Sequence, residues 1–233
     1  MTDDLLELQR LDTTADQLAH RRANLPEREA ARAASSALAD HRRQRTEAAE
    51  REQELALAID SFERDAEQLG AQRTRLEGQL KTVTAARQAE ALLHELETIG
   101  QRRDALDDQE LASLEEQSQV VEAIAALDAA QPGIEAASRG AEQALAVVEA
   151  EIDGQLASVT ADREALAGRI PPDLMARYER LRSRHGGVAV ARLEGSRCSG
   201  CHLDLSTTEL EEVRAAGAGQ LADCPQCGRM LVS

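Results

Sequence analysis

The sequence predicts a mainly α protein in which a long antiparallel coiled-coil hairpin precedes a small C-terminal region built around paired cysteines. Aromatic residues make up 1% of the 233 residues and charged residues 30%, so the chain lacks the large rings that usually fill one globular core. Before residue 171, apolar residues recur at alternating steps of three and four, which is typical of a coiled-coil seam. The four cysteines all follow residue 197, as two C-x-x-C pairs.

The first arm of the hairpin starts near the N-terminus. Pro26 interrupts its seam, because proline removes a helical hydrogen bond and clashes with the preceding turn. The seam becomes strong again from Leu55. Two β-branched threonines in the segment 82–84 predict a turn near residues 82–86. The seam positions of this arm are Leu8, Leu11, Ala15, Leu18, Arg22 and Leu25, then a thin continuation at Ala31, Ala34, Leu38 and Ala48, then Leu55, Ile59, Phe62, Ala66, Leu69, Arg73, Leu76, Leu80 and Val83.

The second arm is expected to run from Ala85 to Ile170, with a break or kink at Pro132-Gly133. The turn divides the coil almost equally, so two arms of about 80 residues can pair antiparallel and bury stripes that neither arm buries alone. A shorter bundle, folded at Pro26 and Pro132, is the alternative. The seam positions of this arm are Leu92, Leu96, Ile99, Leu106, Val120, Ile124, Leu127, Leu145, Val148, Ile152, Val159, Leu166 and Ile170.

The coil is expected to end at Pro171-Pro172, because the residue before a proline is steered out of the helical region. Residues 173–183 then predict a short helix closed by Gly186-Gly187, and residues 188–191 predict a short strand. The chain therefore divides into a hairpin domain over residues 1–170 and a second domain over residues 171–233.

The two C-x-x-C pairs predict a metal site. Two residues between cysteines let one tight turn present both thiolates, and two such turns complete the tetrahedral sulfur shell that Zn²⁺ prefers. Residues 206–209 (STTE) form a capping-box pattern, and a helix from there to about Ala216, before Gly217, accounts for the long gap between the pairs. We predict a zinc ribbon holding one structural Zn²⁺. Its ligands are Cys198, Cys201, Cys224 and Cys227.

Other uses of these cysteines fit less well. A redox-active C-x-x-C calls for a thioredoxin-like βαβ setting, which the sequence around these cysteines does not predict. Two disulfides would suit a secreted chain. A catalytic zinc keeps one ligand position open, whereas four thiolates leave none. His202 is the alternative ligand, but four cysteines suffice and we expect this histidine to be solvated. Three other histidines, His20, His41 and His94, lie in the predicted coil and are expected at surface or seam positions.

Several segments together carry a family resemblance. They are residues 5–12 (LLELQRLD) with 25–27 (LPE), residues 178–182 (YERLR) with 186–191 (GGVAVA), and residues 198–201 (CSGC) with 224–229 (CPQCGR). In these segments the chain resembles bacterial C4-type zinc-ribbon proteins in which a long coiled-coil hairpin precedes the ribbon. The resemblance implies a non-enzymatic protein. It also implies links to flagellar or type III secretion assembly, to an alternative sigma factor or to RNA, as in members of that family.

The charge balance excludes a chain that binds nucleic acid or anionic membranes over its whole surface, since 27 basic and 43 acidic residues leave a net charge of −16. No apolar run is long enough to span a membrane, and the first ten residues lack the features of a signal peptide. Cysteines that bind a metal and form no disulfides are typical of a reducing compartment. We therefore expect a cytoplasmic protein that binds no membrane.

A local basic patch remains a candidate interface. Residues 171–233 contain eight arginines and eight acids, so the excess negative charge belongs to the hairpin. A solvated face, or one docked onto the acidic coil, is the simpler interpretation of the patch. Nucleic-acid contact is the alternative, since clustered arginines suffice for phosphates, although base stacking needs aromatic residues and Tyr178 is the one nearby. The candidate patch residues are Arg177, Arg180, Arg184, Arg192, Arg197 and Arg229.

Three classes of function remain for a chain with these motifs. No phosphate-binding glycine loop, nucleophile elbow or H-E-x-x-H motif occurs, so we expect no enzymatic activity and no small-molecule substrate. The leading class is an adaptor that presents the hairpin and the ribbon to protein partners. The alternative is a regulator that binds RNA or DNA through the ribbon's basic patch. A third class, an RNA-polymerase channel factor, needs acidic residues at the hairpin tip to hold Mg²⁺, and residues 78–88 contain none.

Overall fold

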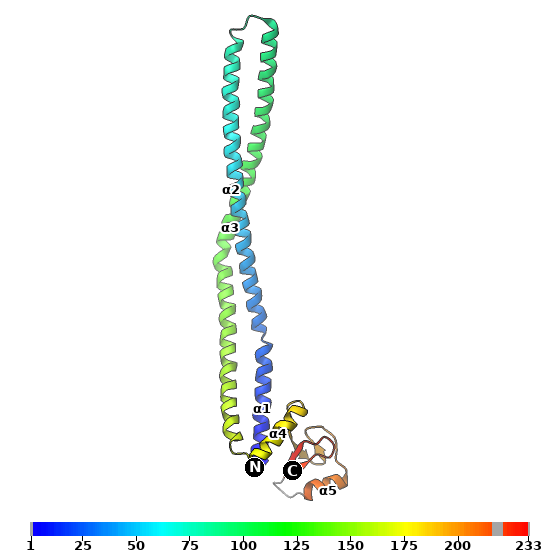
Figure 1. The fold of residues 1–233 in the computed structure, drawn as a ribbon. Helices are drawn as coiled ribbons and strands as arrows, with labels where there is room; N and C mark the ends of the chain where they lie inside the picture. Colours follow the sequence, from blue (N-terminus) through cyan, green and yellow to red (C-terminus); the bar gives the residue numbers. More distant parts are fainter. Residues whose placement is uncertain (1, 216–220, 233) are drawn as a thin grey trace. The chain divides into compact units, whose positions relative to one another are not determined.

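The structure, a computed structural model, describes residues 2–215 and 221–232 and confirms the predicted helical hairpin (Figure 1). The residues group into two compact units, a first unit of residues 1–30 and 142–233 and a second unit of residues 31–141. The helices are α1 (Thr2–Ala23), α2 (Pro26–Leu80), α3 (Ala86–Ala167), α4 (Pro172–Arg184) and α5 (Thr207–Ala215). The strands are β1 (Val190–Glu194), β2 (Arg197–Cys198), β3 (Ala222–Asp223) and β4 (Met230–Val232).

The helix breaks before Pro26, where the sequence predicts an interruption. The amide side chain of Asn24 donates to the carbonyl oxygen of His20 at 2.8 Å, so it satisfies a carbonyl at the end of α1. Pro26 is the first residue of α2, a position where its missing N–H costs no hydrogen bond. Leu25, between the two helices, is buried. The break is therefore a capped junction between two helices.

In the second unit, α2 and α3 run antiparallel and cross (Figure 1). The predicted turn near residues 82–86 is confirmed, since α2 ends at Leu80 and α3 begins at Ala86. Ion pairs flank the seam: Arg45 pairs with Asp128 at 2.9 Å, and Arg51 with Glu116 at 2.7 Å. The buried apolar side chains of the seam in this unit are Ala31, Leu55, Ile59, Leu76 and Ile99.

Of the break or kink expected at Pro132-Gly133, the break is wrong, because α3 continues through both residues to Ala167. Pro132 is exposed, so the carbonyl oxygen that loses its helical partner lies on the solvent side and can be hydrated. Nearby, the Gln131 side chain donates to Glu135 at 2.9 Å, and Ile134 is half-buried in the seam. Packing on both sides of the proline therefore outweighs one missing hydrogen bond.

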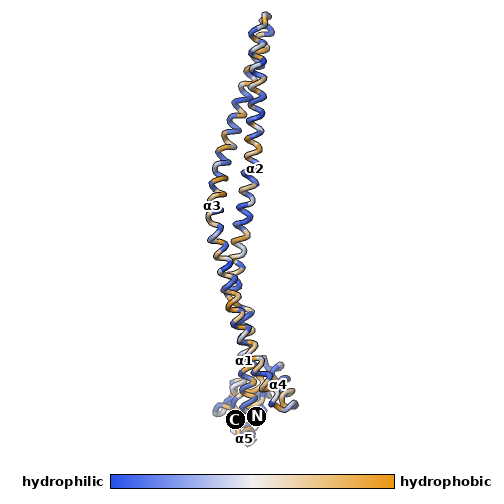
Figure 2. The backbone as a smooth tube through the Cα atoms, turned by 90° about the vertical axis from the view of Figure 1, so that its left-hand side faces the viewer, coloured by the Kyte–Doolittle hydropathy of each residue, from blue (hydrophilic) through white to orange (hydrophobic). Residues whose placement is uncertain are grey.

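Hydrophobic residues recur on several faces of α3 and are not confined to its seam. Figure 2 shows hydrophobic and hydrophilic residues alternating along both long helices. Within residues 2–215 and 221–232, no helix combines the length and the apolar character that crossing a membrane requires.

The first unit has a core that joins its helices to its sheet. Leu5, Leu8 and Leu11 of α1 share one buried cluster with residues of α3, α4, β1 and β4. Tyr178 of α4 and Met230 of β4 are fully buried in this cluster. This grouping differs from the predicted division at residues 170 and 171, because α1 and the end of α3 pack with residues that follow the coil.

The sheet has the strand order β2-β1-β4-β3. Strand β1 is antiparallel to β2 and parallel to β4, and β3 is antiparallel to β4. The short strand expected at residues 188–191 lies instead at Val190–Glu194, because pairing with β4 begins at Val190. The predicted short helix is confirmed as α4, and the glycines that follow it have positive φ angles of 62° and 95°.

Candidate metal centre and its surroundings

The four predicted ligands come together in the first unit. Cys198 ends β2 and Cys224 follows β3, while Cys201 and Cys227 lie in the turns after them. All four sulfur atoms lie within 4.8 Å of one another, and those of Cys201 and Cys224 are 4.0 Å apart. Sulfurs bound to one tetrahedral zinc ion at about 2.3 Å stand about 3.8 Å apart. The arrangement therefore fits such an ion, and the 4.0 Å separation is too wide for a disulfide.

The two cysteine turns have the same backbone geometry. In the first turn, the N–H of His202 donates to the carbonyl oxygen of Cys198 at 2.8 Å, and the N–H of Cys198 donates to the Leu203 carbonyl. In the second, the N–H of Gly228 donates to the carbonyl oxygen of Cys224 at 2.7 Å, and the N–H of Cys224 donates to the Arg229 carbonyl. Two matched turns thus present one buried and one half-buried sulfur each to a common point.

Gly200 allows the first turn to lie against the sheet. A Cβ atom at this position would stand 2.8 Å from Cδ of Arg229 and 2.9 Å from Cβ of Ala191, closer than carbon atoms pack. His202 is exposed with a φ angle of 59°, and the ligand cluster among the described residues consists of cysteines. The alternative of a histidine ligand therefore gains no support.

Burial raises the pKa of Cys201, and it raises that of Cys224 to about 12. Without metal, these two groups are thiols at neutral pH, whereas metal binding requires thiolates. Loading the site must therefore displace protons, and the binding energy of the ion stabilises the fold around it. The cluster that surrounds the sulfurs is small and apolar, with Ala191, Leu205, Val213 and Leu231 as its buried members beside the cysteines.

The predicted capping box is present at the start of α5. The backbone N–H of Ser206 donates to the carboxylate of Glu209 at 2.7 Å, and the N–H of Glu209 donates to the Ser206 hydroxyl at 3.4 Å. The expected helix end at Ala216, before Gly217, lies outside the described residues, and α5 is described to Ala215. The helix packs against the metal cluster through Val213.

Gln9 of α1 connects the helices to the strands, a role that no sequence pattern predicted. Its amide nitrogen donates to the carbonyl oxygen of Gly187 at 2.7 Å. Its amide oxygen accepts from the backbone N–H groups of Ala189 and Val190 at 2.6 and 3.2 Å. One side chain therefore satisfies backbone groups at the start of β1 that the sheet leaves unpaired.

Asp12 of α1 is a second missed residue, and it is 1% exposed. Its carboxylate accepts from the hydroxyl of Tyr178 at 2.7 Å and from Nε of Arg163 at 2.5 Å. Burial, followed by the hydrogen bond to Asp12, raises the pKa of Tyr178, so its hydroxyl stays a donor. Both Gln9 and Asp12 directly follow buried leucines of α1, which is the one sequence signal that they share its buried face.

Three of the six arginines in the candidate basic patch bind carboxylate or carbonyl groups within the first unit. Arg177 pairs with Asp223 of β3, and Nε of Arg197 donates to the carbonyl oxygen of His202 at 2.7 Å. Arg229 donates to the carbonyl oxygens of Val188 and His185 at 2.9 and 3.2 Å. The other predicted patch residues, Arg180, Arg184 and Arg192, are exposed. A nucleic-acid role for the patch stays a prediction.

The coil histidines differ in burial. His20 and His94 are exposed, as expected for surface positions. His41 is buried in the seam of the second unit, where its Nε2 lies 3.0 Å from the carbonyl oxygen of Leu127.

Two segments of the chain match known families. Residues 8–186 match the CT398-like coiled coil hairpin domain, and residues 197–231 match the C4-type zinc ribbon domain. An uncharacterized protein of Mycobacterium tuberculosis H37Rv is 32% identical over 98% of this chain and 93% of its own length. The structure of CT398 from Chlamydia trachomatis has a TM-score of 0.82 at 23% identity, covering 99% of this chain and 96% of that one. A structure from Mycobacterium smegmatis has a TM-score of 0.81 at 23% identity, covering 99% and 97%.

Proposed function

Because the chain belongs to the family of CT398-like coiled-coil hairpin proteins with a C4-type zinc ribbon, as the sequence resemblance predicted, we propose that it is a non-enzymatic adaptor of the cytoplasm. The hairpin presents long helical surface to protein partners. The ribbon holds one structural Zn²⁺ on Cys198, Cys201, Cys224 and Cys227 and forms a second contact point.

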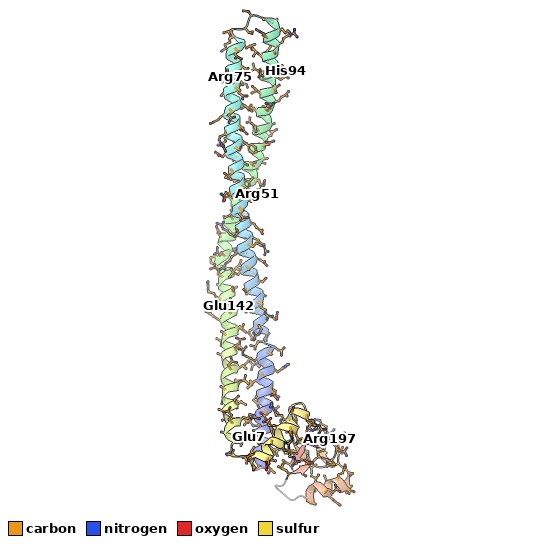
Figure 3. All side chains as sticks on the ribbon, viewed as in Figure 1. Glu7, Arg51, Arg75, His94, Glu142 and Arg197 are labelled. Atoms are coloured by element: carbon orange, nitrogen blue, oxygen red, sulfur yellow. The ribbon has the colours of Figure 1, made fainter. Side chains whose placement is uncertain are left out.

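The exposed apolar side chains of the hairpin carry this proposal. A two-helix hairpin buries one stripe of each helix, and larger helical proteins cover further apolar faces with another helix. Figure 3 displays side chains projecting along both helices of the second unit, from Arg51 towards Arg75 and His94. Large apolar residues are among them, and a protein partner would supply the missing layer. The exposed large apolar residues of this unit are Leu57, Leu93, Leu111, Leu114 and Val121.

The zinc site supports a structural role for the metal. Four cysteine sulfurs within 4.8 Å of one another leave a tetrahedral zinc ion no open position for water or substrate. The hydrogen bonds of Gln9 to the start of β1 hold the ribbon strands against α1. Because these hydrogen bonds fix the ribbon strands on α1, the ribbon offers a partner a rigid surface.

Affinity purification of the zinc-loaded full chain from its native cell, with and without nuclease treatment, tests the proposal. An adaptor retains the same protein partners after nuclease. Partners that disappear after nuclease would favour the regulator that binds RNA or DNA, and its Arg180→Glu, Arg184→Glu variant would then lose them while keeping zinc. The absence of any retained partner in both arms would overturn the adaptor role.

A further inference from the structure

The outer face of α3 in the second unit combines exposed apolar residues with an unbroken excess of negative charge. Leu111 is 57% exposed, Leu114 43% and Val121 47%. Residues 104–138 contain nine acids and no lysine or arginine. Three of these acids, Glu116, Asp128 and Glu135, form ion pairs with arginines of α2.

The other acids include a group that shares the outer face with the apolar residues. At about 100° per residue, Leu111, Leu114 and Val121 fall within an arc of about 80° on α3. The seam residues Val120 and Ile124 fall outside this arc, about 100° and about 60° from Val121, and both are half-buried. The exposed acids beside the apolar arc are Asp104, Asp107, Asp108, Glu115 and Glu122.

We propose that this face of α3, the acidic-apolar face of residues 104–122, binds a basic amphipathic helix of a partner protein. The inference rests on the proposed adaptor function and names the chemistry of its partner. An apolar stripe on the partner helix would cover Leu111, Leu114 and Val121, while its lysines or arginines would lie beside the acids. The stripe from Leu111 to Val121 extends for about 15 Å, so about three to four helical turns of partner suffice.

Charge decides between this occupant and a second copy of the same chain. Two copies that met through this face would bring their exposed acids together, and like charges at short range oppose association. A basic helix instead gains attraction at every acid that it approaches. Because the acids are exposed, salt should weaken this attraction.

The test measures binding of a synthetic peptide to the zinc-loaded full chain. The probe is an 18-residue amphipathic peptide with leucines on one face and lysines on the other, and its control has the same composition in scrambled order. We expect the scrambled peptide to bind at least about tenfold more weakly, because it cannot present both faces at once. Raised salt should weaken binding of the patterned peptide.

Two variants of the face locate the binding. An apolar variant carries Leu111→Gln, Leu114→Gln and Val121→Gln, and a charge variant carries Asp107→Asn, Asp108→Asn and Glu122→Gln. We expect affinity to fall about tenfold or more in the first and about fivefold in the second. The matched control on α2, which carries Leu57→Gln, Glu63→Gln and Glu67→Gln, should bind as the wild type does. Unchanged far-UV circular dichroism shows that each variant is folded.

Equal binding by all variants, or no binding of the patterned peptide, would overturn the inference. A wild-type chain that dimerises in sedimentation, with an apolar variant that stays monomeric, would assign the face to a second copy and overturn it as well. A separate experiment judges the adaptor function: affinity purification with the apolar variant shows whether the protein partners still bind the chain. Partners that remain on this variant would leave the adaptor function standing and place their contact elsewhere.

Discussion

Replacing Asp12 with alanine should destabilise the first unit more than any other single acid-to-alanine change in α1. The carboxylate is the acceptor for Tyr178 and for Arg163, at 2.7 and 2.5 Å, and it is 1% exposed. Alanine would leave a buried hydroxyl and a largely buried guanidinium without this acceptor. Desolvated groups that lose a partner cannot regain water, so the cost is larger than that of a surface pair.

The magnitude follows from the contacts. Removing one partner of a buried ion pair costs about 3–5 kcal/mol. Arg163 keeps Glu179 as a second partner, and its side chain is 24% exposed, which favours the lower end of that range. We expect Asp12→Ala to lower the free energy of unfolding by about 3 kcal/mol. Tyr178→Phe removes one hydrogen bond to a charged acceptor and should cost about 1.5 kcal/mol.

Urea unfolding of the zinc-loaded full chain measures these changes. Tyr178 is the one tyrosine in a chain without tryptophan, so its fluorescence reports the first unit in the variants that keep it. Far-UV circular dichroism follows the helices in all variants, including Tyr178→Phe. Asp16→Ala is the matched control, since this carboxylate lies one turn further along α1, is exposed and pairs with Arg182 at 2.9 Å. The control should cost less than about 1 kcal/mol. Equal losses in Asp12→Ala and Asp16→Ala would refute the reasoning.

Three further outcomes are expected. The pKa of Tyr178 is raised in the folded state, so this residue contributes its full stabilisation below the unfolded tyrosine pKa of about 10. That contribution is lost as the pH rises through the pKa of Tyr178 in the folded state. Near-ultraviolet tyrosinate absorbance should therefore rise well above pH 10, and half-ionisation of the folded protein at about pH 10 would contradict the burial of Tyr178. Chelation of zinc should leave most far-UV helix signal intact while residues after Arg197 become sensitive to protease; collapse of that signal would count against separate stabilisation of the helices. Gly200→Ala should cost about 1–3 kcal/mol and speed zinc loss to a chelator, because its Cβ would meet Ala191, whereas Gly154→Ala meets nothing within 4 Å and should stabilise α3. Equal effects of the two glycine changes would show that close packing does not explain Gly200.

Patterns that depend on local chemistry could be predicted from the sequence. The alternating apolar steps predicted the paired helices, and the threonines near residue 84 predicted their turn. Residues 206–209 predicted the capping box, because its hydrogen bonds join neighbours in the chain. The four cysteines predicted a zinc ribbon, and the family match confirms that domain.

Contacts between distant segments could not be predicted. Gln9 and Asp12 are polar residues on a charged helix, and nothing local indicates that their partners lie beyond residue 160. The patch arginines were grouped by their positions along the chain, whereas Arg177 finds Asp223 and Arg229 finds backbone carbonyls. Such pairings follow from tertiary packing, which outweighs helical-face patterns.

Pro132 shows the same limit for a local rule. Proline predicts a break because it removes one hydrogen bond and crowds the preceding turn. In α3 the proline faces solvent, and seam contacts on either side hold the helix together. Whether a proline breaks a long helix therefore depends on which face it occupies, and that depends on the partner helix.

The most direct test of an adaptor that binds its protein partner through the acidic-apolar face of α3 is photo-crosslinking in the native cell, with a photoreactive residue placed at Leu111 of the zinc-loaded chain. The same residue at Glu63, on an exposed part of α2, is the control. The account predicts that Leu111 crosslinks to a discrete protein partner, that nuclease treatment leaves the crosslink intact, and that Glu63 yields much less of it. Crosslinks from Leu111 that are no stronger than those from Glu63, or that join nucleic acid rather than protein, would contradict it.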